Sequence, residues 1–256
     1  FYAKAEEGYL EILKFLPADA KERLDITEHL AASIYKQGEK LRALDKTQEA
    51  IAHFLRIAQL APNSSIRVTA DYEAALGYMT LRDWEKASRL FSDFQENHPD
   101  HPLLPDISKQ LANIYLELDQ PFKAAAELEK VMVSNKDLPI RQEAAWQAAE
   151  IYEKAKAPDK AGHLYELYVQ LFPAPLEQAI EVRLKLSEIH DKNNNIKMRD
   201  YWLQEIVKAD QFGGPERNDR TRFLAAKALL TMAEPAYKAF AETRLVEPLQ
   251  KSLVIK

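Results

Sequence analysis

Residues 75–99, with the sequence ALGYMTLRDWEKASRLFSDFQENHP, hold a spacing of small, aromatic and proline residues that recurs along the chain. Its members are Ala75, Tyr78, Ala87, Phe91 and Pro99. The same offsets return at Ala149, Tyr152, Ala161, Tyr165 and Pro173. Tyr115 and Ala124 lie midway between the two sets, so the spacing from one copy to the next is 37 residues. A fixed period shared by several residue types predicts a repeat architecture.

The apolar residues within each copy follow a helical period. Tyr9, Ile12, Leu13 and Leu16, for example, form one stripe along residues 2–16. No segment alternates apolar and polar residues for long enough to predict a strand. Glycine, which tight sheet turns need, occurs only 6 times in 256 residues. The sequence therefore predicts an all-α protein with helices of about 12–18 residues joined by short turns.

The spacing resembles the tetratricopeptide repeat (TPR) family. In that family a small residue and a tyrosine end the first helix, and a small residue, an aromatic residue and a proline mark the second. Small residues let paired helices approach closely, and proline ends a helix. The resemblance implies a right-handed superhelical solenoid of antiparallel helix pairs, with a period of about 37 and about five repeats.

Two repeats depart from the pattern. The third has Leu128 in place of the aromatic residue and Lys136 in place of the proline. An earlier repeat matches at Ala32, Tyr35, Ala50, Phe54 and Pro62. There the tyrosine precedes the alanine by 15 residues instead of nine. We expect either longer helices or an expanded turn around residues 45–47.

The two ends suggest a segment of a longer array. Ala5, Tyr9 and Pro17 match a second helix whose first helix is missing, so residues 1–211 are predicted to be a solenoid that starts mid-repeat. After the turn at residues 212–215, we predict that residues 212–256 form a divergent helical pair, broken near Pro235 and Pro248. Neither end has the polar character of a solenoid cap.

The tail at residues 249–253 and the style of the helix pairs also resemble large bacterial envelope TPR proteins. This resemblance favours a periplasmic or envelope location over a cytoplasmic one.

Composition argues against several function classes. Lys plus Arg total 35 against 40 for Asp plus Glu, a net charge of −5 without the basic excess of nucleic-acid binders. No apolar run approaches the roughly 20 residues of a membrane span, so this segment is not expected to insert into a membrane. There is no cysteine, no glycine-rich phosphate loop and no catalytic motif. His98 and His101 lie in a proline-rich turn without a third ligand. We therefore predict no enzyme activity, no metal and no cofactor.

The candidate binding residues follow from the resemblance, because the first helix of each TPR pair lines the concave groove. Trp146 is an aromatic residue among carboxylates on such a helix, as in a peptide anchor. Lys109 and Asn113 resemble the start of the carboxylate clamp that holds acidic tails, although Glu181 stands where that clamp needs a lysine. The predicted groove residues are Tyr72, Met79, Lys109, Asn113, Trp146, Glu150 and Lys185.

The sequence thus predicts a scaffold or adaptor segment that binds a partner protein or peptide in its groove. The alternative is a structural spacer or self-association module of a larger bacterial envelope protein. The first predicts partner binding that depends on Trp146 and Lys109, and the second predicts self-association without peptide binding.

Overall fold

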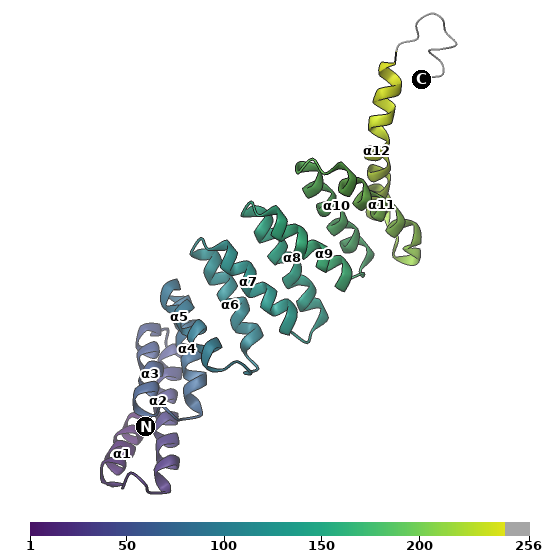
Figure 1. The fold of residues 1–256 in the computed structure, drawn as a ribbon. Coiled ribbons are helices and arrows are strands. Elements are labelled where there is room, and N and C mark those ends of the chain that lie inside the picture. Colours follow the sequence, from purple (N-terminus) through teal and green to yellow (C-terminus); the bar gives the residue numbers. More distant parts are fainter. Residues whose placement is uncertain (244–256) are drawn as a thin grey trace, which may run out of the picture. The chain divides into compact units, whose positions relative to one another are not determined.

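The computed structural model describes residues 1–243, which fold into twelve α-helices and one short 3-10 helix with no strand (Figure 1). The all-α prediction is confirmed. The predicted break near Pro248 and the tail at residues 249–256 lie outside the described residues. Within residues 1–243, no helix combines the length and the apolar character needed to cross a bilayer.

The chain separates into two compact units, which meet in sequence between Asn135 and Lys136. In unit 1, each helix packs against the next one along the chain. Its helices are α1 (Tyr2–Phe15), α2 (Glu22–Ala43), α3 (Thr47–Leu60), α4 (Ile66–Thr80), α5 (Trp84–Asn97), α6 (Leu104–Glu117) and α7 (Pro121–Ser134). The predicted division at residues 211 and 212 stays a prediction.

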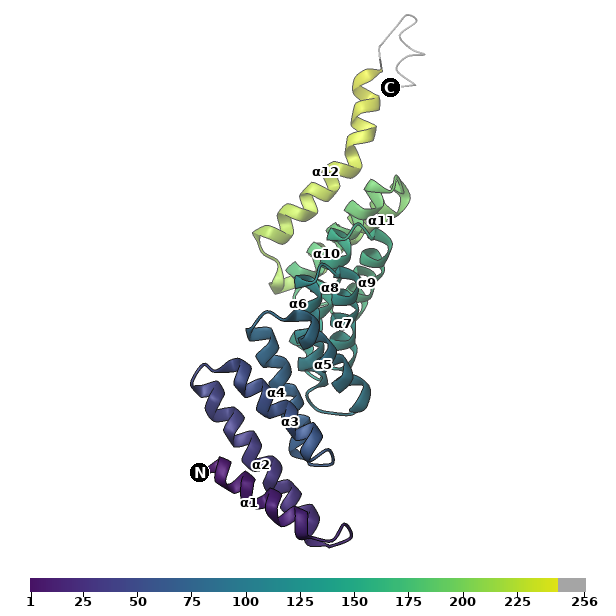
Figure 2. The same cartoon turned by 90° about the vertical axis from the view of Figure 1, so that its left-hand side faces the viewer.

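Unit 2 repeats this arrangement, and α12 packs against both α11 and α10. Its helices are α8 (Leu138–Lys154), α9 (Pro158–Leu171), α10 (Leu176–Lys192), α11 (Ile196–Phe212) and α12 (Asp219–Glu242). The helix α12 continues through Pro235, so the predicted break there is wrong. Proline removes one backbone donor and bends a helix without necessarily ending it, and Figure 2 shows α12 bent along its length.

One turn geometry joins the two helices of every repeat. The second residue after the first helix adopts a left-handed conformation with φ between 54° and 58°. The amide of the following residue then donates back to the carbonyl five positions earlier, as from Asp83 to Tyr78. The left-handed residues are Asp45, Arg82, Asp119, Lys156 and Asn194. They follow one another at intervals of 37 residues, and of 38 at the last, although none is the glycine that such helix ends usually carry.

This turn corrects the prediction for the first repeat. Lys46 donates to the carbonyl of Leu41, which makes Leu41 the counterpart of Tyr78. The counterpart of Ala75 is then Gly38, not Ala32, and a Cβ at Gly38 would lie 2.6 Å from the Phe54 ring. The turn around residues 45–47 is not expanded. Only the first helix is longer, with 22 residues in α2 against 15 in α4.

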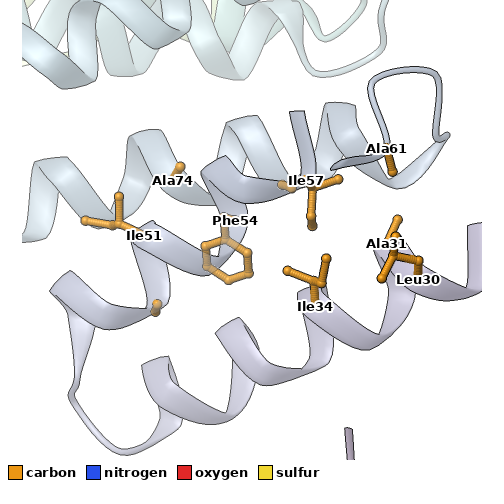
Figure 3. Close-up of a cluster of buried hydrophobic side chains, with 10 residues drawn as sticks. Leu30, Ala31, Ile34, Ile51, Phe54, Ile57, Ala61 and Ala74 are labelled. Atoms are coloured by element: carbon orange, nitrogen blue, oxygen red, sulfur yellow. The ribbon is translucent and has the colours of Figure 1, made fainter. Parts of the chain in front are cut away.

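Small and large apolar residues alternate in the core between helices. In unit 1, Leu30 and Ile34 from α2 meet Phe54 and Ile57 from α3, and Ala74 from α4 closes the cluster (Figure 3). All five side chains are almost fully buried. The alanines at the repeat positions let neighbouring helices come close enough for the rings to fill the space between them.

Candidate functional site

Three repeats carry a pair of aromatic rings, one from each helix. Tyr35 faces Phe54 with ring centroids 5.3 Å apart, and Tyr72 faces Phe91 at 5.7 Å. The third pair joins Trp146 to a tyrosine of α9, Tyr165, at 6.2 Å. The members of successive pairs are separated from their counterparts by one period of 37 residues and then by two. Tyr72 and Trp146 therefore occupy equivalent positions on first helices.

In unit 1, the side chain of Tyr72 is held on both sides. Its ring packs edge-on against the fully buried Phe91, and its hydroxyl donates to Asp106 Oδ2 at 2.6 Å. Burial and this hydrogen bond to Asp106 raise the pKa of Tyr72 well above its ordinary value. Met79 also packs against the buried cluster that contains Phe91. The structure thus places two predicted groove residues mostly in packing contacts.

Lys109 and Asn113 lie four residues apart on α6, so they share a helix face as predicted. Lys109 is half-buried and Asn113 is exposed. Lys109 stands at the repeat position that Tyr72 holds in the preceding repeat. Their role as partner contacts stays a prediction.

In unit 2, the first helices of two repeats border a groove of about 520 Å³. Helices α8 and α10 supply its walls, and Tyr168 of α9 is also part of the lining. The lining residues are Pro139, Gln142, Glu143, Trp146, Tyr168, Gln178, Glu181 and Lys185. Two of the predicted residues, Trp146 and Lys185, are brought together here.

Trp146 is half-buried on a floor of tyrosines. Its ring lies edge-on to Tyr165 and also to Tyr168, at a centroid distance of 6.1 Å from the latter. Gln142 fixes Tyr168 by donating to its hydroxyl at 2.8 Å, and the same amide reaches Gln178 Oε1 at 3.2 Å. The groove therefore has a preset aromatic floor with side-chain amides at its rim.

The cation of the groove is already paired. Lys185 donates to Glu153 Oε2 at 3.2 Å, and Tyr165 donates to the same oxygen at 3.2 Å. Burial raises the pKa of Tyr165 far above its ordinary value, with further contributions from Glu153, Glu150 and Glu188. The predicted residue Glu150 is half-buried on α8, four residues after Trp146, and its charge acts on the Tyr165 hydroxyl.

Glu181 also has a partner. Arg220 at the start of α12 donates from Nε to Glu181 Oε1 at 2.7 Å, and its Nη2 lies 2.7 Å from the same oxygen. The carboxylate that interrupts a carboxylate clamp is therefore partly neutralised from another helix. The sequence did not reveal this pair, because the two residues are 39 positions apart in segments of different pattern.

Several other groove residues were missed. Gln142 lies one helical turn before Trp146 on the same helix face, a signal that was available in the sequence. Tyr168 is three residues after the repeat aromatic Tyr165, and Gln178 carries no pattern at all. Across residues 1–243 there is no cluster of three or more His, Asp or Glu side chains suited to a metal ion.

No protein-family profile and no curated protein matches this sequence. Among solved structures, MamA from Desulfovibrio magneticus RS-1 is 16% identical, covers 71% of this chain and 95% of its own, and has a TM-score of 0.44. YrrB, described as a TPR protein with an unusual peptide-binding site, is 16% identical over 88% of this chain and 98% of its own, with a TM-score of 0.45.

The complex of Naa15/Naa10 bound to HypK-THB gives a TM-score of 0.55 at 17% identity. That match covers 94% of this chain but only 35% of the chain it resembles, so the likeness concerns the fold. The helix pairs, their 37-residue period and their common turn agree with it. The chain has the all-α helix-pair fold of tetratricopeptide repeat proteins.

Proposed function

We propose that this chain is a protein–protein interaction segment that binds an extended peptide of a partner in the groove between α8 and α10. The observation that carries the proposal is the groove itself, about 520 Å³ in volume, with Trp146 half-buried above two tyrosines. Partly exposed tryptophan on a rigid floor is the side chain that most often anchors a binding partner.

The rim supplies what a peptide backbone needs. Gln142 and Gln178 carry both donors and acceptors, so they can pair with backbone amides of either orientation. These side chains stand on helices, whose backbones are fixed by their own hydrogen bonds, so little ordering is needed when a peptide binds. The groove holds its partner and, in this proposal, performs no chemistry on it.

The other predicted residues enter the proposal with different weights. Lys185 lines the groove while paired with Glu153, and Glu150 stands on the Trp146 face of α8, where we propose that it adds negative charge. Lys109 and Asn113 form a second contact surface in unit 1. Tyr72 and Met79 support that surface from the core, since their side chains already pack against the buried cluster that contains Phe91.

A peptide display library selected on the purified chain tests the proposal. We expect enriched peptides whose affinity falls at least about ten-fold in the Trp146→Ala variant, the size expected for an anchor residue. The combined variant Trp146→Ala with Lys109→Ala should lose more. Urea unfolding and circular dichroism on each variant establish that it is folded.

The matched control is Trp84→Ala, which removes a tryptophan of α5 that packs beside the core of unit 1 and is not part of the groove lining. It should leave peptide affinity unchanged. Retained binding in the folded double variant would contradict the proposal. Sedimentation of the wild-type chain examines the alternative, because concentration-dependent self-association without peptide binding would favour a spacer or self-association module.

A further inference from the structure

The charged residues that line the unit 2 groove are not equally available to a ligand. Lys185 is bound by Glu153 at 3.2 Å, and Glu181 by Arg220 at 2.7 Å. These two pairs largely cancel their own charges. What remains at the groove is decided by the carboxylates on α8, the helix that carries Trp146.

Two such carboxylates flank the tryptophan. Glu143 precedes Trp146 by three residues and Glu150 follows it by four, so all three side chains lie on one face of α8. Within residues 1–243, neither glutamate forms an ion pair of 4 Å or less. Glu143 accepts only the neutral amide of Gln147, at 2.6 Å.

The charges of both carboxylates act on the tyrosines of the aromatic floor. Burial raises the pKa of Tyr168, and the charge of Glu143 adds to that rise. Glu150 acts in the same way on Tyr165, after burial and the closer Glu153. On their shared face of α8, the indole of Trp146 thus stands between two carboxylates.

A cationic side chain satisfies this arrangement. A guanidinium or ammonium group is attracted to the face of an indole, and tryptophan is the strongest such partner. The planar guanidinium also donates to carboxylate and amide oxygens, which Glu143, Gln142 and Gln178 present. An acidic peptide would meet two carboxylates whose charge no cation offsets, so the groove disfavours it.

We propose that the groove between α8 and α10 selects a partner peptide through an arginine or lysine side chain, held over Trp146 between Glu143 and Glu150. This inference rests on the proposed peptide-binding function and names the chemistry of its partner. It is the reverse of the acidic tail that a carboxylate clamp would hold.

The test uses N-acetyl-arginine amide as the probe and N-acetyl-citrulline amide as its neutral counterpart of nearly the same shape. The chain has three tryptophans, and their indole N–H signals in nuclear magnetic resonance are assigned with Trp146→Phe and Trp84→Phe. We expect arginine amide to shift the Trp146 signal alone, with at least about five-fold higher affinity than the citrulline compound.

The Glu143→Gln/Glu150→Gln double variant should lower the affinity for arginine amide to that for citrulline amide. The matched control is Asp159→Asn/Glu166→Gln on α9, which changes the net charge equally outside the groove lining and should preserve the preference. Equal binding of both probes to the wild-type chain, or an unchanged preference in the groove variant, would overturn the inference.

The two levels of the proposal fail in different ways. If display peptides depend on Trp146 but bind equally well when their basic residues are replaced by citrulline, the cation preference is wrong and the binding function stands. If arginine amide binds at Trp146 but no displayed peptide does, the cation site stands and the peptide-binding function is wrong.

Discussion

The aromatic pairs of the two units occupy the same repeat positions but serve different ends. We call the ring from the first helix of a repeat the outer ring and the ring from the second helix the inner ring. In unit 1 the outer ring, Tyr72, carries a hydroxyl, which donates to Asp106 of the next repeat, and the inner ring is Phe91. In unit 2 the outer ring is Trp146, and the inner ring, Tyr165, carries the hydroxyl, which donates to Glu153 of the same repeat. The outer ring is therefore committed to packing in one unit and open to a groove in the other.

This difference teaches that the repeat fixes where a side chain stands, while the neighbouring repeat decides what it is free to do. In unit 1, Asp106 of the next repeat accepts a hydrogen bond from the hydroxyl of Tyr72. Beside Trp146, the neighbouring helix α10 instead offers Gln178, Glu181 and Lys185 around an open volume. Within residues 1–243, a groove that can take a ligand is therefore found where the next repeat offers no hydrogen-bond partner to the outer ring.

The inner rings should be equivalent, because both are fully buried. We expect Phe91→Ala and Tyr165→Ala each to lower the free energy of unfolding by about 3–5 kcal/mol, through lost burial and the cavity left behind. Urea unfolding followed by circular dichroism measures both. A cost below about 1 kcal/mol at either position would break the equivalence.

The outer rings should differ in how much they contribute to the free energy of unfolding. Tyr72→Phe removes a hydrogen bond to a carboxylate and should cost about 1–2 kcal/mol. Trp146→Phe keeps an aromatic ring at a half-exposed site and should cost less than about 1 kcal/mol. The same urea unfolding experiment applies. If Trp146→Phe proved the more destabilising variant, Trp146 would be a packing residue like Tyr72.

Alkaline pH should destabilise both units through the two hydroxyls. The pKa values of Tyr72 and Tyr165 are raised in the folded chain, chiefly by burial and by the carboxylate each hydroxyl contacts. The unfolded chain then loses protons first, so stability is complete below about pH 10 and falls as pH rises above it.

Each such tyrosine contributes a slope of up to about 1.4 kcal/mol per pH unit. Urea unfolding between about pH 9 and pH 11 measures the total slope. Tyr72→Phe and Tyr165→Phe should each reduce it, while Tyr35 and Tyr168, whose pKa values are also raised by burial, account for a remainder. An unchanged slope in either variant would show that its hydroxyl is not the group that titrates.

The turns should respond alike in both units, with the smallest effect. Arg82 in unit 1 and Lys156 in unit 2 have φ values of 58° and 57°, which glycine adopts without strain. Arg82→Gly and Lys156→Gly should each raise the free energy of unfolding by about 0.5–1 kcal/mol. Arg82→Ala and Lys156→Ala are the controls, and a gain with alanine would trace the effect to the side chain instead.

The period predicted most of the fold, because helix ends and ring positions recur at fixed offsets. It failed in the first repeat. There Ala32 and Tyr35 have the spacing that marks the end of a first helix elsewhere, but this helix continues to Ala43. Only the left-handed residue Asp45 shows the true register, and aspartate carries no signal as strong as glycine would. Tyr35 does have a repeat counterpart, Tyr72, and both lie in the interior of their helices and not at the ends.

The binding site was harder to predict than the fold. Trp146 was identifiable, because an aromatic residue among carboxylates is unusual on a helix face. Its tyrosine floor follows from the repeat position of Tyr165. The pairing of Glu181 with Arg220 was not predictable, since it depends on how α12 packs beside α10. Charge balance in a groove is a tertiary property that one helix does not encode.

The common turn also determines where a helix can grow. In α2, the turn at Asp45 keeps its register, and the additional residues precede the helical segment that corresponds to α4. The difference, 22 residues against 15, is seven, or close to two turns of helix, so the buried face is kept. Glu28, within this extension, accepts hydrogen bonds from Ser64 and Ser65. A hairpin anchored at one end and extensible at the other lets evolution or a designer adjust its reach in whole helical turns.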